Sequence, residues 1–117
     1  DAYGQSKLAN ILFSNVLADR LKDTGITSNA LHPGGVDTPI FRHVPSAVMA
    51  LIRPTLTTPE KAASLPVSLA LDEQYAQISG EYFANHKPAL RSPRARNSNL
   101  ADELYYDTMA ELNMPAL

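Results

Sequence analysis

Residues 3–35 read YGQSKLANILFSNVLADRLKDTGITSNALHPGG, and their pattern sets the expected architecture. Apolar side chains recur at helical spacing in two adjacent stripes, formed by Ala9, Phe13, Leu17 and Leu21 and by Leu8, Ile11, Leu12 and Val16. Stripes of this width predict a long helix that packs against a sheet and ends at Gly25. Residues 26–31 then predict a short buried strand, and residues 33–35 predict a sharp turn.

The rest of the chain carries a second set of alternating signals. We expect a loop over residues 39–56 with a short helix at 46–52, a helix over 57–71, a strand over 80–85, a basic loop over 86–98 and a terminal helix over 100–112. Thr57 and Glu60 fit a capping box at the start of the helix over 57–71, and Pro59 fits its first turn. Pro66 lacks a backbone donor inside that helix, so we expect a kink or an early end there.

The order of these elements indicates the fold class. Helix, strand, loop, helix, strand and helix in succession are typical of α/β proteins, in which a parallel sheet carries helices on both faces. A parallel sheet rarely stands as two strands alone. The sequence therefore predicts an α/β fold and a chain that forms only part of a larger sheet.

The composition is that of an ordinary globular protein, because 44% of the 117 residues are hydrophobic, 19% are charged and the net charge is -2. This charge balance gives no sign of a nucleic-acid-binding face. The absence of cysteine excludes a disulfide framework, a thiolate zinc site and a cysteine nucleophile, and it fits a reducing compartment such as the cytoplasm. No apolar run approaches the ~20 residues of a membrane span, and no signal peptide is visible, although a targeting or anchoring segment before Asp1 stays open.

Tyr3 and Lys7 are four residues apart at the start of the first helix, which places both side chains on one face. An ammonium close to a phenol favours the phenolate, so such a pair can move a proton to or from a carbonyl or alcohol oxygen. The simpler interpretation is two polar residues on a first helical turn, because this spacing often arises by chance. The context favours chemistry, since the next strand ends at Pro33 and ligands of open α/β sheets bind beyond the carboxyl ends of strands.

Four segments in the same order carry a resemblance to a known family. They are Tyr3-Gly4-Gln5-Ser6-Lys7-Leu8-Ala9-Asn10, then Asn29-Ala30-Leu31-His32-Pro33-Gly34-Gly35-Val36-Asp37-Thr38, then Ser79-Gly80-Glu81-Tyr82-Phe83, and finally Ser92-Pro93-Arg94-Ala95-Arg96-Asn97 with Leu100-Ala101. Together they resemble the short-chain dehydrogenases/reductases. The last segment resembles the end of their retinol-dehydrogenase-like or WW-domain-oxidoreductase-like branch. The resemblance implies that residues 1–117 are the C-terminal part of a single dehydrogenase domain with a Rossmann-type, doubly wound parallel sheet.

The same resemblance implies that the N-terminal half, which holds most of the cofactor, lies outside these residues. The family's catalytic serine and its glycine-rich, pyrophosphate-binding turn have no counterpart in the chain. The cofactor would be NAD(P), with the choice between NAD and NADP undetermined. We expect no activity from the 117-residue chain alone, and poor folding, because its apolar helix face and strand edges have lost their neighbours.

The resemblance implies an NAD(P)-dependent oxidoreductase that interconverts an alcohol and a carbonyl of a small, often apolar molecule by hydride transfer. Tyr3 would be the catalytic acid/base, and Lys7 would assist it and hold the nicotinamide ribose, so both also count as cofactor contacts. A non-catalytic binding or scaffold protein with the same fold stays open as an alternative. Sugar epimerases share the Tyr-x-x-x-Lys spacing but differ in their downstream segments. A homo-oligomer is also left open.

The turn after the first strand supplies further cofactor contacts by resemblance. Pro33 and Gly34 would shape the turn beneath the nicotinamide, the Val36 backbone would bind its carboxamide, and the Thr38 hydroxyl would contact the carboxamide or pyrophosphate. A glycine lets the backbone approach a ligand, and a turn after a strand presents free amides. Residues 39–56 occupy the family's variable substrate loop and would select the substrate.

The remaining polar groups carry weaker signals. His32, His43 and His86 have no carboxylate or cysteine at metal-ligand spacing, so we expect structural or exposed histidines and no metal site. No G-x-S-x-G nucleophile elbow is present. A basic loop is formed by Lys87, Arg91, Arg94 and Arg96. We expect this loop to be solvated, and a phosphate or lipid-headgroup contact is the less favoured alternative.

Overall fold

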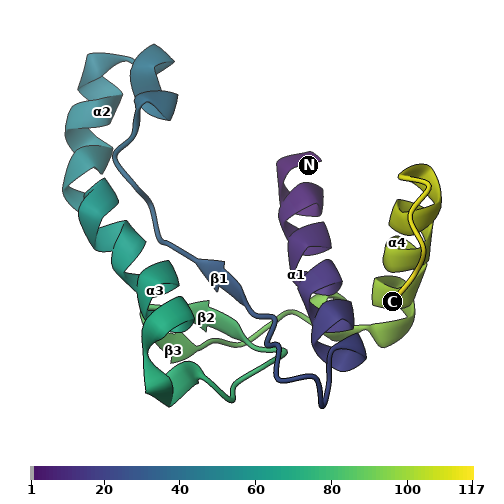
Figure 1. Ribbon diagram of the computed structural model, residues 1–117. Coiled ribbons are helices and arrows are strands. Elements are labelled where there is room, and N and C mark those ends of the chain that lie inside the picture. Colours follow the sequence, from purple (N-terminus) through teal and green to yellow (C-terminus); the bar gives the residue numbers. More distant parts are fainter. Residues whose placement is uncertain (1) are drawn as a thin grey trace.

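The computed structural model describes residues 2–117 as a small sheet with helices on both sides. The helices are α1 (Ala2–Arg20), α2 (Ser46–Ile52), α3 (Pro59–Leu71) and α4 (Ser98–Glu111), and the strands are β1 (Ala30–His32), β2 (Tyr82–Ala84) and β3 (Lys87–Pro88). Short 3-10 turns cover residues 39–43, 53–55, 73–75 and 94–96. Figure 1 shows α1 and α4 side by side, α3 on the other side of the sheet, and α2 extending away from it.

The sheet has the strand order β1-β2-β3. Strands β1 and β2 are parallel, with Leu31 opposite Phe83, whereas β2 and β3 form an antiparallel hairpin. Asn85 and His86 both adopt positive φ, 50° and 61°, as a two-residue type I′ turn requires. The basic loop expected over residues 86–98 is therefore wrong at its start, where β3 continues the sheet. Histidine is a less usual residue than glycine in such a turn, so the sequence carried little sign of the hairpin.

The strand expected over residues 26–31 forms later, at Ala30–His32. Ile26 is 57% exposed and cannot belong to a buried strand. At Asn29, hydrogen bonds from the side chain take the place of backbone pairing between strands. The side-chain amide donates to the Ile78 carbonyl at 2.7 Å, and the side-chain oxygen accepts from the Glu81 N–H at 3.0 Å. Side-chain bonds of this kind compete with regular pairing and delay the start of the strand.

The helices follow the expected order with shifts at their ends. The short helix at 46–52 forms with the expected bounds, and α4 begins two residues early, at Ser98. Helix α1 ends at Arg20 rather than at Gly25, and residues 21–25 form a turn in which Gly25 has φ 80°. The residues between the helix and this glycine tighten into turns, as helix ends commonly do.

The start and interior of α3 also correct two expectations. Its N-cap is Thr58, not Thr57, because the Thr58 hydroxyl accepts from the Lys61 N–H at 3.3 Å. The Glu60 carboxyl has a pKa below its usual 4.5, because it accepts a hydrogen bond from the backbone N–H of the same residue and, to a smaller extent, from the Thr58 hydroxyl. Helix α3 continues past Pro66, which lies on its exposed side, so an early end at this proline is wrong.

Two apolar clusters hold the elements together. On the α3 side of the sheet, Phe83 is fully buried and meets the Tyr75 ring edge-on at 5.5 Å, with Leu65 packed beside them. The second cluster joins α1 to α4 through buried side chains, which are Leu12, Val16, Ala101 and Tyr105. Residues alternate between the faces of a strand, so the neighbours of Phe83 in β2 point toward α1.

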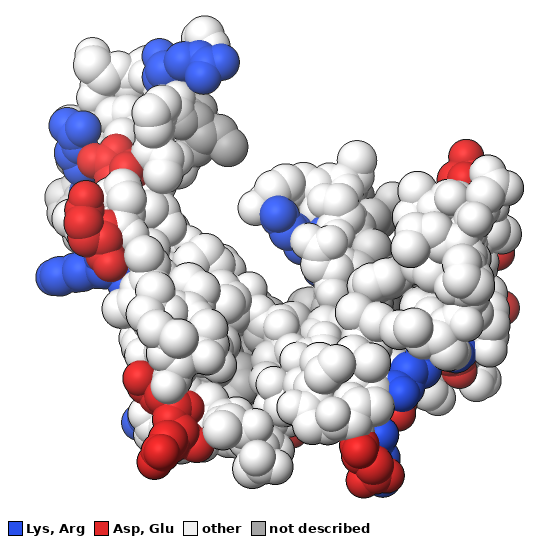
Figure 2. Space-filling model, viewed as in Figure 1, with Lys and Arg blue, Asp and Glu red and all other residues white. Residues whose placement is uncertain are grey.

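Figure 2 shows the surface hollowed between the arm formed by α2 and α3 and the pair formed by α1 and α4. The walls of this hollow are mostly uncharged in this view, and the charged side chains gather around the outer edges. None of the helices described within residues 2–117 is long and apolar enough to cross a membrane. The hollow therefore has the character of a binding site for a small molecule, because such sites are concave and mostly apolar.

Candidate active site

A cavity of about 600 Å³ lies between the first turns of α1 and the carboxyl end of β1. Helix α1 and strand β1 run in opposite directions, so the start of the helix meets the end of the strand (Figure 1). The residues that line the cavity are Tyr3, Lys7, Asn10, Ile11, Ser14, Asn29, Ala30, Leu31, His32, Pro33, Gly34 and Tyr82. Four of the six residues selected from the sequence are among them, and they come from segments about thirty positions apart.

The side chains of Tyr3 and Lys7 lie on one face of α1, as their spacing predicts. The Lys7 Nζ atom lies 5.3 Å from the centroid of the Tyr3 ring, a distance at which the ammonium is attracted to the ring face. Tyr3 is 70% exposed, so its hydroxyl is accessible from the cavity mouth. The Ser6 hydroxyl donates to the Tyr3 carbonyl at 2.8 Å and stabilises the first turn of the helix. The pair is therefore ordered but open to an incoming molecule.

The turn at Pro33 and Gly34 forms the opposite wall. Gly34 has φ 84°, and a Cβ atom built on it would meet nothing within 4 Å. Among the described residues, no acceptor lies within hydrogen-bonding reach of the N–H groups of Gly34, Gly35 and Val36. Successive free amides in a turn of this kind form an attractive site for a carbonyl oxygen or an anion.

Val36 does not line this cavity. It forms a parallel bridge with Thr57, in which the Thr57 N–H donates to the Gly35 carbonyl at 2.8 Å and the Asp37 N–H donates to the Thr57 carbonyl at 2.9 Å. The bridge uses the groups on either side of Val36, so its own N–H and C=O point to the opposite edge. The bridge fixes the turn in place and leaves the Val36 amide free.

Thr38 lies farther along, outside the cavity, in a second hollow of about 550 Å³ below the segment that carries α2. In the part of the chain that the structure describes, its hydroxyl makes no capping bond to the 3-10 turn that follows. The base of this segment is closed by an ion pair between Arg53 Nε and Asp37 Oδ2 at 2.9 Å. The two ends of the expected substrate loop are thus tied together beside the cavity.

Sequence reasoning missed five polar side chains in the cavity, which are Asn10, Ser14, Asn29, His32 and Tyr82. Tyr82 reaches it from β2. The signal for Tyr82 was the alternation of side chains along a strand, which sends it away from buried Phe83 and toward α1. No signal marked Asn10, because an asparagine on an exposed helical turn is common. Within residues 2–117, no group of three or more histidine, cysteine, aspartate or glutamate side chains could hold a metal ion.

Comparison with known proteins finds chains of similar sequence, although no family model matches this one. Dehydrogenase/reductase SDR family member 13 from Bos taurus is 42% identical over 109 residues, which cover 89% of this chain and 29% of that protein. Retinol dehydrogenase 12 from Homo sapiens is 41% identical over 108 residues, covering 89% and 34%. Retinol dehydrogenase 11 from Homo sapiens is 37% identical over 118 residues, covering 97% and 36%. The chain is a relative of the retinol-dehydrogenase-like short-chain dehydrogenases/reductases.

The chain spans about a third of the length of the curated relatives it matches. The similarity to retinol dehydrogenase 11 covers nearly the whole of the chain. The family resemblance is therefore confirmed. The expected α/β class is confirmed as well, because the β1–β2 pair is parallel and lies between helices, as in part of a Rossmann-type fold.

Proposed function

We propose that the protein carrying this chain is an NAD(P)-dependent oxidoreductase that interconverts an alcohol and a carbonyl. The observation that carries the proposal is the meeting of Tyr3 and Lys7 with the Pro33–Gly34 turn around one cavity. A proton donor and a backbone platform on opposite walls can hold a carbonyl group between them. The relatives named retinol dehydrogenases support the same reaction class.

The turn has the properties that a nicotinamide requires. Space is open at Gly34, and the N–H groups of Gly34, Gly35 and Val36 meet no acceptor among the described residues. In the proposal, Pro33 and Gly34 form the floor under the nicotinamide ring, and the Val36 N–H donates to its carboxamide. The Thr38 hydroxyl would contact the carboxamide or the pyrophosphate. When bound, the nicotinamide supplies or accepts the hydride.

The chain's own residues would handle the proton. The Tyr3 hydroxyl donates to the carbonyl oxygen in the reducing direction and takes the alcohol proton in the oxidising direction. The Lys7 ammonium, which lies beside the ring, stabilises the phenolate that forms when the proton leaves, and it holds the ribose hydroxyls. Both groups stand on one helix, so their mutual geometry is fixed before any ligand arrives.

The substrate in this proposal is a small, apolar alcohol or carbonyl compound. The cavity walls beside the catalytic pair are supplied by Ile11, Ala30, Leu31 and Tyr82. The segment over residues 39–55, closed at its base by the Asp37–Arg53 pair, would cover the substrate. Apolar walls with a few convergent polar groups are typical of sites for small lipid-like molecules.

The proposal is tested by replacing the catalytic hydroxyl. The protein is expressed from its complete reading frame and assayed with NAD(H) and NADP(H) against a panel of apolar alcohols and aldehydes. We expect Tyr3→Phe to lower kcat by roughly 100-fold or more, the usual contribution of a general acid, with the Kd of the cofactor nearly unchanged. Lys7→Met should lower kcat and also weaken cofactor binding.

Tyr106→Phe is the matched control, because this tyrosine is 52% exposed on α4, away from the cavity. It should keep the wild-type kcat. Full activity in Tyr3→Phe would refute the catalytic assignment. A wild-type protein that binds NAD(P) but turns over no alcohol or carbonyl would instead support the alternative, a binding or scaffold protein that keeps the fold.

A further inference from the structure

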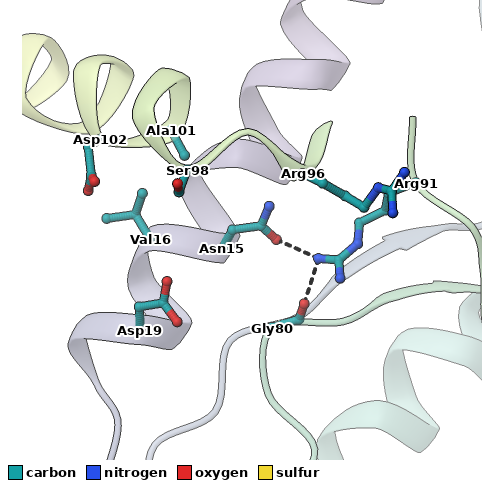
Figure 3. Close-up of a pocket in the computed structure, with 9 residues that line it drawn as sticks. All are labelled: Asn15, Val16, Asp19, Gly80, Arg91, Arg96, Ser98, Ala101 and Asp102. Atoms are coloured by element: carbon teal, nitrogen blue, oxygen red, sulfur yellow. Dashed lines mark hydrogen bonds between the residues drawn. The ribbon is translucent and has the colours of Figure 1, made fainter. Parts of the chain in front are cut away.

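Helix α1 carries Tyr3 at one end and a polar cluster about 18 Å farther along, at Asn15. Figure 3 shows the guanidinium of Arg91 pointing to the Asn15 side chain and to the Gly80 carbonyl, beside a cavity of about 300 Å³. This cluster lies at the opposite end of the strands from Tyr3. The loop that contains Arg91 was expected to be solvated, but the Arg91 side chain is only 19% exposed.

The contacts of Arg91 tie separate segments together. Its Nη1 atom donates to Asn15 Oδ1 at 2.9 Å and to the Gly80 carbonyl at 2.7 Å, and its Nη2 atom lies 3.8 Å from Glu81. The Asn15 amide nitrogen in turn donates to the Ala95 carbonyl at 2.9 Å. Helix α1, the entry to β2 and the segment before α4 are thus joined at one point. Hydrogen bonds that involve a charged, mostly buried donor are among the stronger ones in proteins.

The fixed part of α1 is its second half. Leu12 and Val16 are the buried residues of the helix, and Ser14 bonds to Ser28 at 3.0 Å. Residues 2–7 are all exposed, and they include both members of the catalytic pair. The direction in which the first turns of α1 point therefore depends on the contacts that hold its second half.

We propose that Arg91, acting through Asn15, is a positioning residue that sets where Tyr3 stands relative to the Gly34 turn. This inference rests on the proposed function, because it assigns Arg91 a role in that reaction. The guanidinium fixes the rotation of α1 against β2, and because α1 is one continuous helix, this rotation sets the position of its first turns at the cavity. Tyr3 and Lys7 move together on the helix. Loss of the Arg91 hydrogen bonds therefore changes their distance to the Gly34 turn and leaves their distance to each other unchanged.

The test compares Arg91→Met with Arg94→Met in the protein expressed from its complete reading frame. Methionine keeps an apolar stem of similar length and removes the donors. Arg94 is a matched control, because it is exposed in the same loop and has no ion-pair partner among the described residues. We expect Arg91→Met to lower kcat by about 10-fold to 100-fold, since a displacement near 1 Å at a reacting group costs that much. The pH profile of Arg91→Met should stay close to that of the wild type, and Arg94→Met should keep the wild-type kcat.

A merely structural role predicts a different outcome. In that case Arg91→Met would lower the Tm while kcat per folded molecule stayed at the wild-type value, and the proposal would be overturned. Arg91→Lys, which keeps a charged donor, should restore part of the lost kcat. Asn15→Leu combined with Arg91→Met should do no more harm than either change alone, because the two side chains act as one unit.

A second readout keeps the test valid without turnover. Hydrogen–deuterium exchange reports how often the α1 amides open. Uptake by residues 6–12 should rise in Arg91→Met and stay at the wild-type level in Arg94→Met. Unchanged uptake in Arg91→Met would overturn the positioning role, whether or not the protein is an enzyme. Failure of the proposed function appears separately, as full activity in Tyr3→Phe or as absent wild-type turnover.

Discussion

Replacing Gly34 by alanine separates the two tasks of the turn at the end of β1. Gly34 has φ 84°, and a Cβ atom there would meet nothing within 4 Å, so the substitution brings no steric clash. Its cost comes from the backbone conformation, which disfavours a residue with a side chain by roughly 1–2 kcal/mol. Alanine also restricts the unfolded chain, which offsets about 0.4–1 kcal/mol. The net expected loss in the free energy of unfolding lies between about 0 and 1.6 kcal/mol, with a centre near 1 kcal/mol.

Gly25 provides a matched control. It has φ 80°, again with nothing within 4 Å of a built Cβ, but it lies in the turn after α1 and not at the cavity. Gly25→Ala should therefore cost about the same stability as Gly34→Ala. Only Gly34→Ala places a methyl group in the space where the nicotinamide would bind. We expect that variant alone to weaken NAD(P)H binding, by roughly tenfold in Kd, which corresponds to 1.4 kcal/mol.

Urea unfolding of the protein measures the first quantity, and fluorescence titration with NADH and NADPH measures the second. With an m-value near 2 kcal/mol/M, a loss of about 1 kcal/mol shifts the midpoint by about 0.5 M. A difference of more than ~1 kcal/mol between the two variants would show that φ does not set the cost, a spread that ordinary surface substitutions do not reach. Equal cofactor Kd values for both variants would refute the placement of Gly34 beneath the nicotinamide.

Three further predictions concern the core, the pH response and the chain by itself. Phe83→Ala should lower the free energy of unfolding by about 3–5 kcal/mol, measured by urea unfolding, whereas Val67→Ala at an exposed position of α3 should change it by less than about 0.5 kcal/mol. Glu60 has a lowered pKa in the folded protein, so its stabilising effect is present above the ordinary value of 4.5 and is lost as the pH falls below it. The Tm of the wild type should therefore exceed that of Glu60→Gln at pH 6 and match it at pH 3, and a constant difference would contradict the assignment. The purified 117-residue chain should show no turnover with NAD(P)⁺ and an alcohol, and steady turnover by that chain would contradict the expectation.

The elements whose signals are local could be read from the sequence. Apolar periodicity placed α1, the apolar residues scattered within the expected loop indicated the short helix at Ser46–Ile52, and the Pro-Gly pair placed the turn after β1. The Tyr3–Lys7 spacing placed both side chains on one face, where the structure has them. In each case the deciding interaction spans only a few residues, so the pattern contains the information that the structure uses.

The features that could not be predicted depend on contacts with residues that are distant in the sequence. The strand β1 starts late because Asn29 bonds to groups about 50 positions away, at Ile78 and Glu81. Arg91 looked like one of several loop cations. Its contacts with Asn15, 76 positions away, and with Gly80 and Glu81 distinguish it from Arg94. Such contacts follow from how the helices pack on the sheet, which local spacing does not encode.

The side chains of β2 alternate between two faces of the sheet, one that packs in the hydrophobic core and one that lines the candidate cavity. Phe83 points toward α3 and is fully buried beside Tyr75, whereas Tyr82 points toward α1 and lines the candidate cavity. In β1 the division is less sharp: Ala30, opposite Tyr82, lines the cavity, and Leu31, opposite Phe83, both packs against the Phe83 cluster and lines the cavity. Substitutions on the α3 face should therefore change the free energy of unfolding, and those on the α1 face should change turnover. The hydrogen bond between Arg91 and Asn15 lies on the α1 face, so its loss should be seen in turnover, through the position of Tyr3.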